Sequence, residues 1–417
     1  MDKQQQTLSP TAPGERIRSM DILRGFALLG ILIMNIQNFA MIEAAYMNPL
    51  AYGDLTGLNK GVWIFSHIFG DLKFMTLFSI MFGAGILMMS ERATQRGQSA
   101  AGLHYRRTFW LLIIGLLHAY LLWRGDILVP YALCAVLVFL FRKRSPKTLF
   151  ILGLLSISVT SAIYFLSGWS IQFWPPESIN QTMMSWQPGA DSVAKEIAAY
   201  QGGWLDQMEN RVPSSLMFQT FVFLIWTSWR VGGLMLIGMA LFKWGVLTAN
   251  RSVPFYRNMT LIGFAIGLPV VIYGIVQNFA AGWSMQYSMF LGVQFNYWGS
   301  LFISMGFMGG IMLICKTANP SRMTDALAAV GRTALSNYLL QTLICTTIFY
   351  GHGLGLFGRV DRVGQILLVL AIWAVQLIVS PIWLKHFRYG PAEWLWRSLT
   401  YKSLQPWRVK MPVAESP

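Results

Sequence analysis

Ten long apolar runs, separated by short segments that carry most of the charge, limit this chain to one class of fold. An α-helix needs about 20 residues to cross the hydrocarbon of a bilayer, and most of these runs approach or exceed that length. Within a bilayer, only helices and closed barrels satisfy every backbone hydrogen-bonding group. The sequence therefore predicts an all-α polytopic integral membrane protein with about ten transmembrane helices. The predicted spans are approximately residues 22–42, 61–90, 108–123, 126–141, 148–169, 213–242, 258–280, 287–315, 333–350 and 364–384.

The distribution of basic residues predicts the orientation of these spans. If residues 1–20 form a retained cytoplasmic tail, the inner loops and both termini hold 23 of the 32 Lys and Arg residues. Cytoplasmic loops carry an excess of Lys and Arg, so both termini are predicted to be cytoplasmic. The span at 213–242 is interrupted by "WRVGG", but dividing it would put the six basic residues after position 384 outside. We therefore keep it as one span.

The predicted parts of the chain follow from this topology. An outward loop, residues 170–212, is net acidic and aromatic, and it contains "DSVAKEIAAY", which is typical of a capped short helix. This helix could lie on the bilayer surface or cover a substrate. The predicted parts are a tail at 1–20, a first transmembrane half at 21–169, the loop at 170–212, a second half at 213–390 and a cytoplasmic tail at 391–417.

Composition excludes two classes of site. The net charge is +15, but the basic residues form short blocks between apolar runs, so no nucleic acid is expected as a partner. The three cysteines lie in or beside apolar segments without metal-binding spacing, and no metal is expected.

Ionisable groups inside spans are functional candidates, because each costs several kcal/mol unless it faces a protein interior or water. Arg24 lies one turn into the first span, and Asn35 lies three turns further along near the same face. Lys73 lies near mid-membrane, too deep for easy snorkelling, and Arg230 lies toward the cytoplasmic end of the sixth span. Together, Arg24, Lys73 and Arg230 could form a positive funnel for phosphates, with snorkelling and ion pairing as the simpler explanations.

Two histidine–aspartate pairs are candidate bases. His67 and Asp71 are four residues apart, so on a helix they share a face. His118 lies about 15 Å into the third span, and the tight turn at Gly125 could bring Asp126 back toward it. Imidazole titrates near neutrality and can take a proton from a hydroxyl or amine, although a buried structural histidine remains the alternative.

Several motifs resemble the YeiB family of bacterial inner-membrane proteins over essentially the whole chain. They are "MDILRGFALLGILIMN", "KFMTLFSIMFGAG", "HAYLLWRGDIL", "GRTALSNYLLQTLICTTIFY" and "GPAEWLWRSLTY". The resemblance implies a multi-pass protein of the bacterial inner membrane. His118 belongs to the family's HxxxxWxGDIL motif, and we favour it over His67.

More distantly, the chain is similar to transmembrane acyltransferases, including heparan-α-glucosaminide N-acetyltransferase and bacterial O-acyltransferases. These enzymes share an Arg-Gly pair at the entry of the first span. In the O-acyltransferases a histidine follows the arginine in the same helix, whereas this chain has Asn35 at that position. The resemblance therefore implies an acyl donor but requires a base from elsewhere in the chain.

The main hypothesis is a transmembrane acyltransferase. It would use cytoplasmic acyl-CoA, with acetyl-CoA the first choice, as co-substrate, and Arg24, Lys73, Arg230 and Asn35 would bind it. His118 with Asp126, or His67 with Asp71, would activate a hydroxyl or amine acceptor at the outer side. The alternatives are a transporter or lipid-linked flippase, and a scaffold whose polar groups only join helices. Expected partners are membrane lipids and a small-molecule, glycan or lipid-linked acceptor, and the sequence leaves homo-oligomerisation open.

Overall fold

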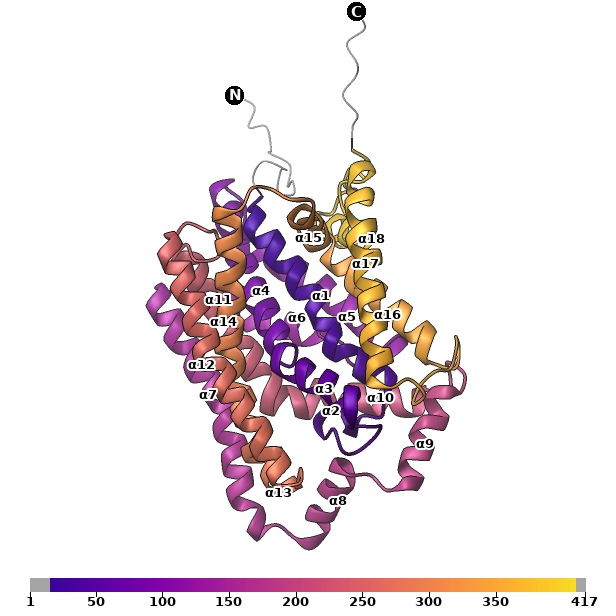
Figure 1. The fold of residues 1–417 in the computed structure, drawn as a ribbon. Coiled ribbons are helices and arrows are strands. Elements are labelled where there is room, and N and C mark those ends of the chain that lie inside the picture. The colour runs from indigo at the N-terminus through magenta and orange to yellow at the C-terminus, as the bar shows by residue number, and fades with distance from the viewer. Residues whose placement is uncertain (1–15, 410–417) are drawn as a thin grey trace, which may run out of the picture.

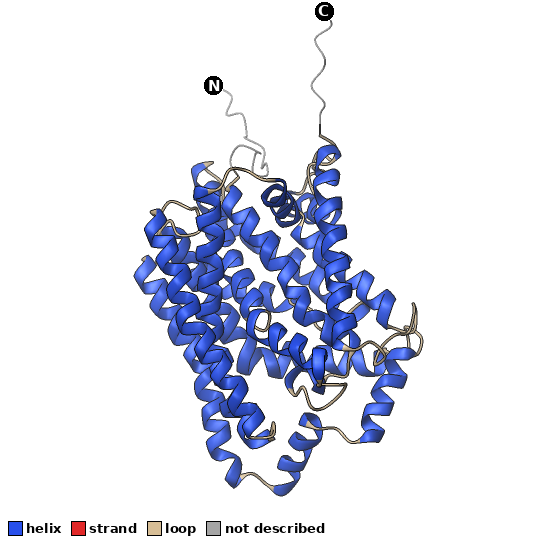
Figure 2. Ribbon diagram, viewed as in Figure 1, coloured by secondary structure: helices blue, strands red, loops and turns tan. Residues whose placement is uncertain are grey.

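The computed structural model describes residues 16–409, and all regular structure in this range is helical apart from one isolated bridge between Phe387 and Arg408 (Figures 1 and 2). Seven helical stretches are long and apolar enough to cross a membrane. The predicted class, an all-α polytopic membrane protein, is confirmed. These stretches comprise α1 (Arg18–Ala40), α3 and α4 (Gly57–Phe69 and Lys73–Gln95), α7 (Pro146–Ser170), α10 and α11 (Met208–Met217 and Ser228–Lys243), α12 (Val253–Ala280), α13 and α14 (Met285–Tyr287 and Val293–Thr317) and α17 (Arg362–His386).

Three further helices coincide with the remaining predicted spans. They are α5 (Ala100–Leu121), α6 (Leu128–Val138) and α16 (Ala334–Phe349). The short helices are α2 (Ala44–Met47), α8 (Pro176–Trp186), α9 (Ala190–Gln201), α15 (Arg322–Arg332) and α18 (Pro391–Tyr401). The number of crossings and the side on which the termini lie stay predictions.

The predicted spans at 61–90 and 213–242 have internal irregularities. The span at 61–90 is two helices, because the chain turns between α3 and α4 at Leu72, whose φ of 65° is left-handed. The span at 213–242 remains helical throughout, and the stretch Phe218–Thr227 between α10 and α11 is a π-helix. "WRVGG" therefore lies inside a helix and does not divide it.

One end of the bundle holds the start of α1 together with α15 and α18, and we call it the basic end (Figure 1). Here α1 and α15 pack with backbone in contact. A Cβ on Gly25 would lie 1.9 Å from the Leu327 carbonyl oxygen, and a Cβ on Gly331 would lie 1.9 Å from that of Asp21. Glycine is required at both positions because any side chain would force the two helices apart.

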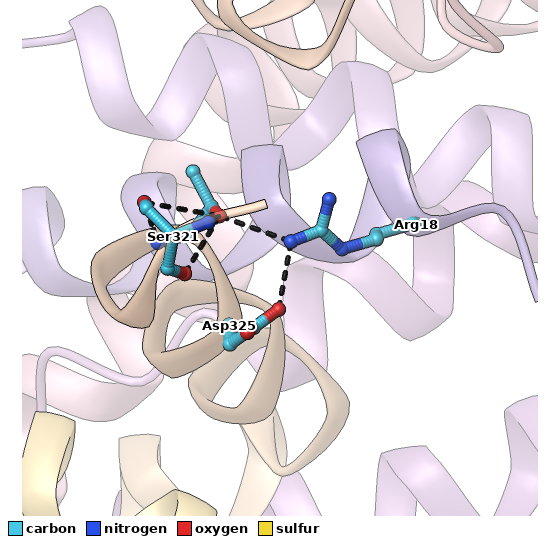
Figure 3. Close-up of polar contacts among 4 residues, drawn as sticks. Arg18, Ser321 and Asp325 are labelled. Carbon is cyan, nitrogen blue, oxygen red and sulfur yellow. Dashed lines mark hydrogen bonds and ion pairs between the residues drawn. The ribbon is translucent and has the colours of Figure 1, made fainter. Parts of the chain in front are cut away.

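The N-terminus of α15 is fixed to α1 by polar contacts. The Arg18 guanidinium bonds the Asp325 carboxylate at 2.7 Å and the Thr324 hydroxyl at 2.9 Å (Figure 3). Ser321 caps α15 by accepting the Thr324 backbone N–H. Of the predicted tail at 1–20, residues 1–15 lie outside the described residues, and α1 begins at Arg18.

The opposite end is covered by the loop that was predicted at 170–212, and the short helix expected from "DSVAKEIAAY" is α9. Trp186 of α8 and Tyr200 of α9 are buried in the protein. The Trp186 indole donates to the Trp283 carbonyl at 2.8 Å, and the Tyr200 ring stacks on Phe357. α8 and α9 are therefore held to the bundle by aromatic anchors.

Candidate functional site

The structure brings His118 and Asp126 together between α5 and α6. Asp126 Oδ1 lies 2.7 Å from His118 Nδ1, and Oδ2 accepts the Val129 backbone N–H at 2.7 Å. Both side chains of the pair are only 1% exposed. The turn between them needs Gly125, because a Cβ there would lie 2.3 Å from the Trp123 ring. As predicted, the chain turns back at Gly125 and brings Asp126 to His118.

The second imidazole nitrogen faces α16. His118 Nε2 lies 2.9 Å from the Thr342 hydroxyl oxygen, and the Tyr338 ring lies 5.1 Å from the imidazole, centroid to centroid. The Tyr338 hydroxyl accepts the Ile127 backbone N–H at 3.3 Å. If Asp126 is ionised it can only accept, and a neutral His118 then carries its proton on Nδ1 and accepts from Thr342 at Nε2. Hydroxyl, imidazole and carboxylate therefore form one chain along which a proton can move.

A cavity of about 240 Å³ opens at the basic end between α1, α4, α5, α15, α16 and α18. Along α1 the lining changes from Arg24 to Leu28 and Ile31, which lie further from the basic end, and Tyr338 of α16 also lines the cavity, with its ring 5.1 Å from that of His118. Among the described residues it is lined by seven arginines against only Asp21 and Glu393 as carboxylates. The arginines are Arg16, Arg24, Arg92, Arg96, Arg107, Arg332 and Arg397.

These arginines are close enough to affect one another. Burial lowers the pKa of the Arg16 guanidinium to about 10, and Asp21 opposes this shift. The charges of Arg332, Arg397 and Arg24 lower it further. Like charges crowded in a partly closed space favour an anion among them, and the guanidinium matches phosphate by paired hydrogen bonds.

The helix α18, part of the segment predicted as a tail at 391–417, forms one wall of this cavity. Its buried Glu393 accepts the Leu335 backbone N–H at 2.6 Å, at the N-terminus of α16. Its Trp396 indole donates to the Arg107 carbonyl at 2.9 Å, and the Arg107 guanidinium lies 4.3 Å from the Trp396 ring centre. The cavity therefore depends on α18.

The second histidine–aspartate pair lies at the break between α3 and α4. His67 Nδ1 is 3.2 Å from Asp71 Oδ2, and these side chains are 15% and 16% exposed. Asn296 of α14 donates to Asp71 at 2.7 Å and accepts from the Lys73 ammonium. Lys73 also donates to the His67 carbonyl at 2.7 Å. The residues of this cluster are therefore hydrogen-bonded mainly to one another.

The expected funnel of Arg24, Lys73 and Arg230 is not formed. Only Arg24 lines the cavity; Lys73 belongs to the His67 cluster. Arg230 is fully buried, donates to the Ser300 hydroxyl at 2.8 Å and the Tyr297 carbonyl at 3.1 Å, and does not reach the cavity. Asn35 is half-buried on α1 away from the cavity. Depth along a span is readable from sequence, but the direction a side chain faces is not.

Sequence reasoning missed Thr342 and most of the arginines. Thr342 lies in "NYLLQTLICTT", where nothing marks it among the other hydroxyls. Arg107, Arg332 and Arg397 were counted as loop charges that set topology. Among residues 16–409, no group of three or more His, Cys, Asp or Glu side chains could hold a metal ion.

Comparison with known proteins places the chain in a family. A model described as "Protein of unknown function (DUF418)" matches residues 241–403. The protein named "Uncharacterized protein YeiB" of Escherichia coli is 34% identical over 397 residues, which cover 94% of this chain and 98% of that protein. The chain belongs to the YeiB family.

Other relatives extend over the same length. "Uncharacterized protein YxaH" of Bacillus subtilis is 31% identical over 98% of this chain and all of its own length. A 39.9 kDa protein from Bacillus acidopullulyticus is 27% identical over 97% of the chain. No solved structure matches the chain. The resemblance to the YeiB family drawn from the motifs is confirmed.

Proposed function

We propose that this protein transfers an acyl group from a cytoplasmic acyl-CoA to a hydroxyl or amine acceptor at the outer side of the bacterial inner membrane. The observation that carries the proposal is the cavity at the basic end, whose mouth is rich in arginine and whose deep end reaches the Tyr338–His118 contact. Acyl-CoA has the matching form, with phosphates at one end and a thioester at the other.

Several residues would hold the phosphates. Arg24, Arg332 and Arg397 lie on three different helices, α1, α15 and α18, and all three line the cavity. An anion bound there would therefore be contacted from several sides. Charge-assisted hydrogen bonds from guanidinium groups to phosphate are among the stronger polar contacts in proteins. His118, held by Asp126, would act as base beyond the apolar part of the cavity.

The test is a thermal-shift titration of detergent-purified protein with acetyl-CoA and CoA. We expect a saturable rise in melting temperature, reduced in Arg24→Ala and Arg332→Ala. Arg257→Ala is the matched control, because Arg257 is exposed on α12 and lies outside the cavity. Dephospho-CoA and pantetheine test whether phosphates supply the affinity. No shift in the wild type with any of these compounds would contradict the proposal.

A second candidate, transport, is favoured by the break between α3 and α4. Broken helices with polar groups near the middle of the membrane form substrate and ion sites in many transporters. Here the break holds Asp71 and Lys73 beside Asn296. Transport predicts a proton flux into proteoliposomes under a pH gradient, followed with an enclosed pH dye and lost in Asp71→Asn. Acyl transfer in detergent, without a gradient, would exclude transport as the sole activity.

A further inference from the structure

The hydroxyl of Thr342 has an unusual position for a threonine inside a helix. Such hydroxyls commonly donate to the carbonyl four residues earlier. On the same helix, Thr346 does this at 2.9 Å and Thr347 at 2.7 Å. For Thr342 the corresponding distance, to the Tyr338 carbonyl, is 3.4 Å. This hydrogen bond is longer than those of its neighbours, and the Thr342 hydroxyl oxygen also lies 2.9 Å from His118 Nε2, the shorter of its two contacts.

The proton positions follow from the partners of Asp126. Asp126 Oδ2 accepts the Val129 backbone N–H, and Oδ1 lies 2.7 Å from His118 Nδ1. With Asp126 ionised and His118 neutral, the imidazole carries its proton on Nδ1 and presents a lone pair on Nε2 to the Thr342 hydroxyl. An imidazole oriented by a carboxylate and bonded to a hydroxyl is the arrangement that activates a nucleophilic oxygen.

This geometry constrains the order of events at His118. An acceptor hydroxyl or amine cannot reach Nε2 while Thr342 occupies it, so the first proton that His118 is placed to remove is that of Thr342. If the contact served only to join α5 to α16, a hydrogen bond between the Thr342 hydroxyl and the His118 imidazole would be sufficient, without Asp126. A buried carboxylate adds a desolvation penalty, which a joint between helices does not require.

We propose that Thr342 is a nucleophile that carries the acyl group as a threonine ester between donor and acceptor. The proposal rests on the proposed function, because it needs a thioester donor in the cavity. Thr342 Oγ1 forms a bond to the thioester carbonyl carbon as its proton passes to His118 Nε2. The carbon–sulfur bond breaks, and the departing thiolate takes that proton and leaves as the thiol.

The second half returns the site to its starting state. The acceptor oxygen or nitrogen attacks the ester carbonyl and gives its proton to Nε2. The ester bond to Thr342 breaks, and Oγ1 recovers a proton from the imidazolium. The sum is a thioester plus acceptor giving an acylated acceptor plus a thiol, with no change in oxidation state.

The surroundings suit such an intermediate. Thr342 and His118 are buried, and an enclosed site protects an ester from hydrolysis by excluding water. Tyr338 lies one turn before Thr342 on α16 and lines the cavity, and its ring is 5.1 Å from the His118 ring, so the proposed reaction requires a thioester to pass Tyr338. A covalent relay also removes any need for donor and acceptor to occupy the site together.

The experiment uses the full chain in detergent, incubated with radiolabelled acetyl-CoA without acceptor. We expect label on the α16 peptide, one acetyl group by mass, assigned to Thr342 and removed by alkaline hydroxylamine. Thr342→Val should lower labelling by at least about 100-fold, whereas Thr342→Ser should retain it because it keeps the hydroxyl. Thr346→Val is the matched control on the same helix, and melting temperatures check that each variant is folded.

The outcomes separate the two proposals. A thermal shift with acetyl-CoA and CoA release at the wild-type rate in Thr342→Val would overturn the relay and leave the acyltransferase standing. Label on His118 instead of Thr342 would do the same. If the wild type neither binds acetyl-CoA nor releases CoA, the proposed function fails, and the relay fails with it.

Discussion

The two histidine–aspartate pairs differ in what surrounds them. The His118 pair has side chains 1% exposed, a 2.7 Å contact and a hydroxyl on the second nitrogen, and it adjoins the cavity. The His67 pair is looser at 3.2 Å and 15–16% exposed, and its carboxylate also accepts from Asn296. One pair places an imidazole against a hydroxyl, as our proposal requires, and the other joins three segments by hydrogen bonds.

The largest expected effect is on the rate of CoA release, which should distinguish the His118–Asp126 pair from the His67–Asp71 pair. Asp126→Asn offers one oxygen for two N–H donors, so the imidazole loses its defined tautomer. Loss of that orientation in comparable sites lowers turnover by about 10⁴-fold, and we expect a fall of at least about 10³-fold in CoA release. Asp71→Asn should change the rate by less than about 10-fold, because only the first pair adjoins the cavity. An equal or larger loss in Asp71→Asn would reverse the assignment.

The next largest effect is on the free energy of unfolding, and it tests whether the cluster around the His67–Asp71 pair stabilises the fold. Lys73→Met removes a buried ammonium and leaves Asp71 without its nearby positive charge. Breaking a buried charged cluster is expected to reduce the free energy of unfolding by about 3 kcal/mol, seen as a lower melting temperature. Lys195→Met on α9 is the control, because Lys195 is exposed. If Lys73→Met melts like the wild type but loses activity, the His67 cluster is a working site and not a structural joint.

The smallest effect tests how α16 is positioned. Glu393→Gln removes the charge that accepts backbone N–H groups at the α16 N-terminus, and a loss of about 1 kcal/mol is typical for such a cap. Because α16 carries Tyr338 and Thr342, labelling of Thr342 should slow while melting changes little. Glu177→Gln, exposed on α8, is the control. Unchanged labelling kinetics would show that α18 does not help to place α16.

Much of the fold could be predicted because the bilayer imposes it. The length of each apolar run and the asymmetry of charge carry that information, and the Gly125 turn let Asp126 be paired with His118 across eight residues. The structure also divides the span at 61–90, which hydropathy alone does not reveal because Gly70, Asp71 and Leu72 interrupt it only briefly.

The rest of the candidate site depends on packing between distant segments. Thr342 reaches His118 from 224 residues away. Arg24 and Arg332 line the same cavity because Gly25 and Gly331 let α1 and α15 approach closely. Lys73 and Arg230 were expected beside Arg24 from their depth, but the helices turn them to other partners. Hydrophobic periodicity gives the height of a residue in the membrane and leaves its neighbours undetermined.

The walls of the cavity have a consequence for biosynthesis. They are contributed by Arg16 beside α1 and by Arg397 of α18, which are translated at opposite ends of the described chain. The seven long apolar stretches all precede α18 in the described chain, so they are synthesised before the helix that supplies Arg397 to the cavity. The cavity therefore cannot be complete until the last described helix has been made.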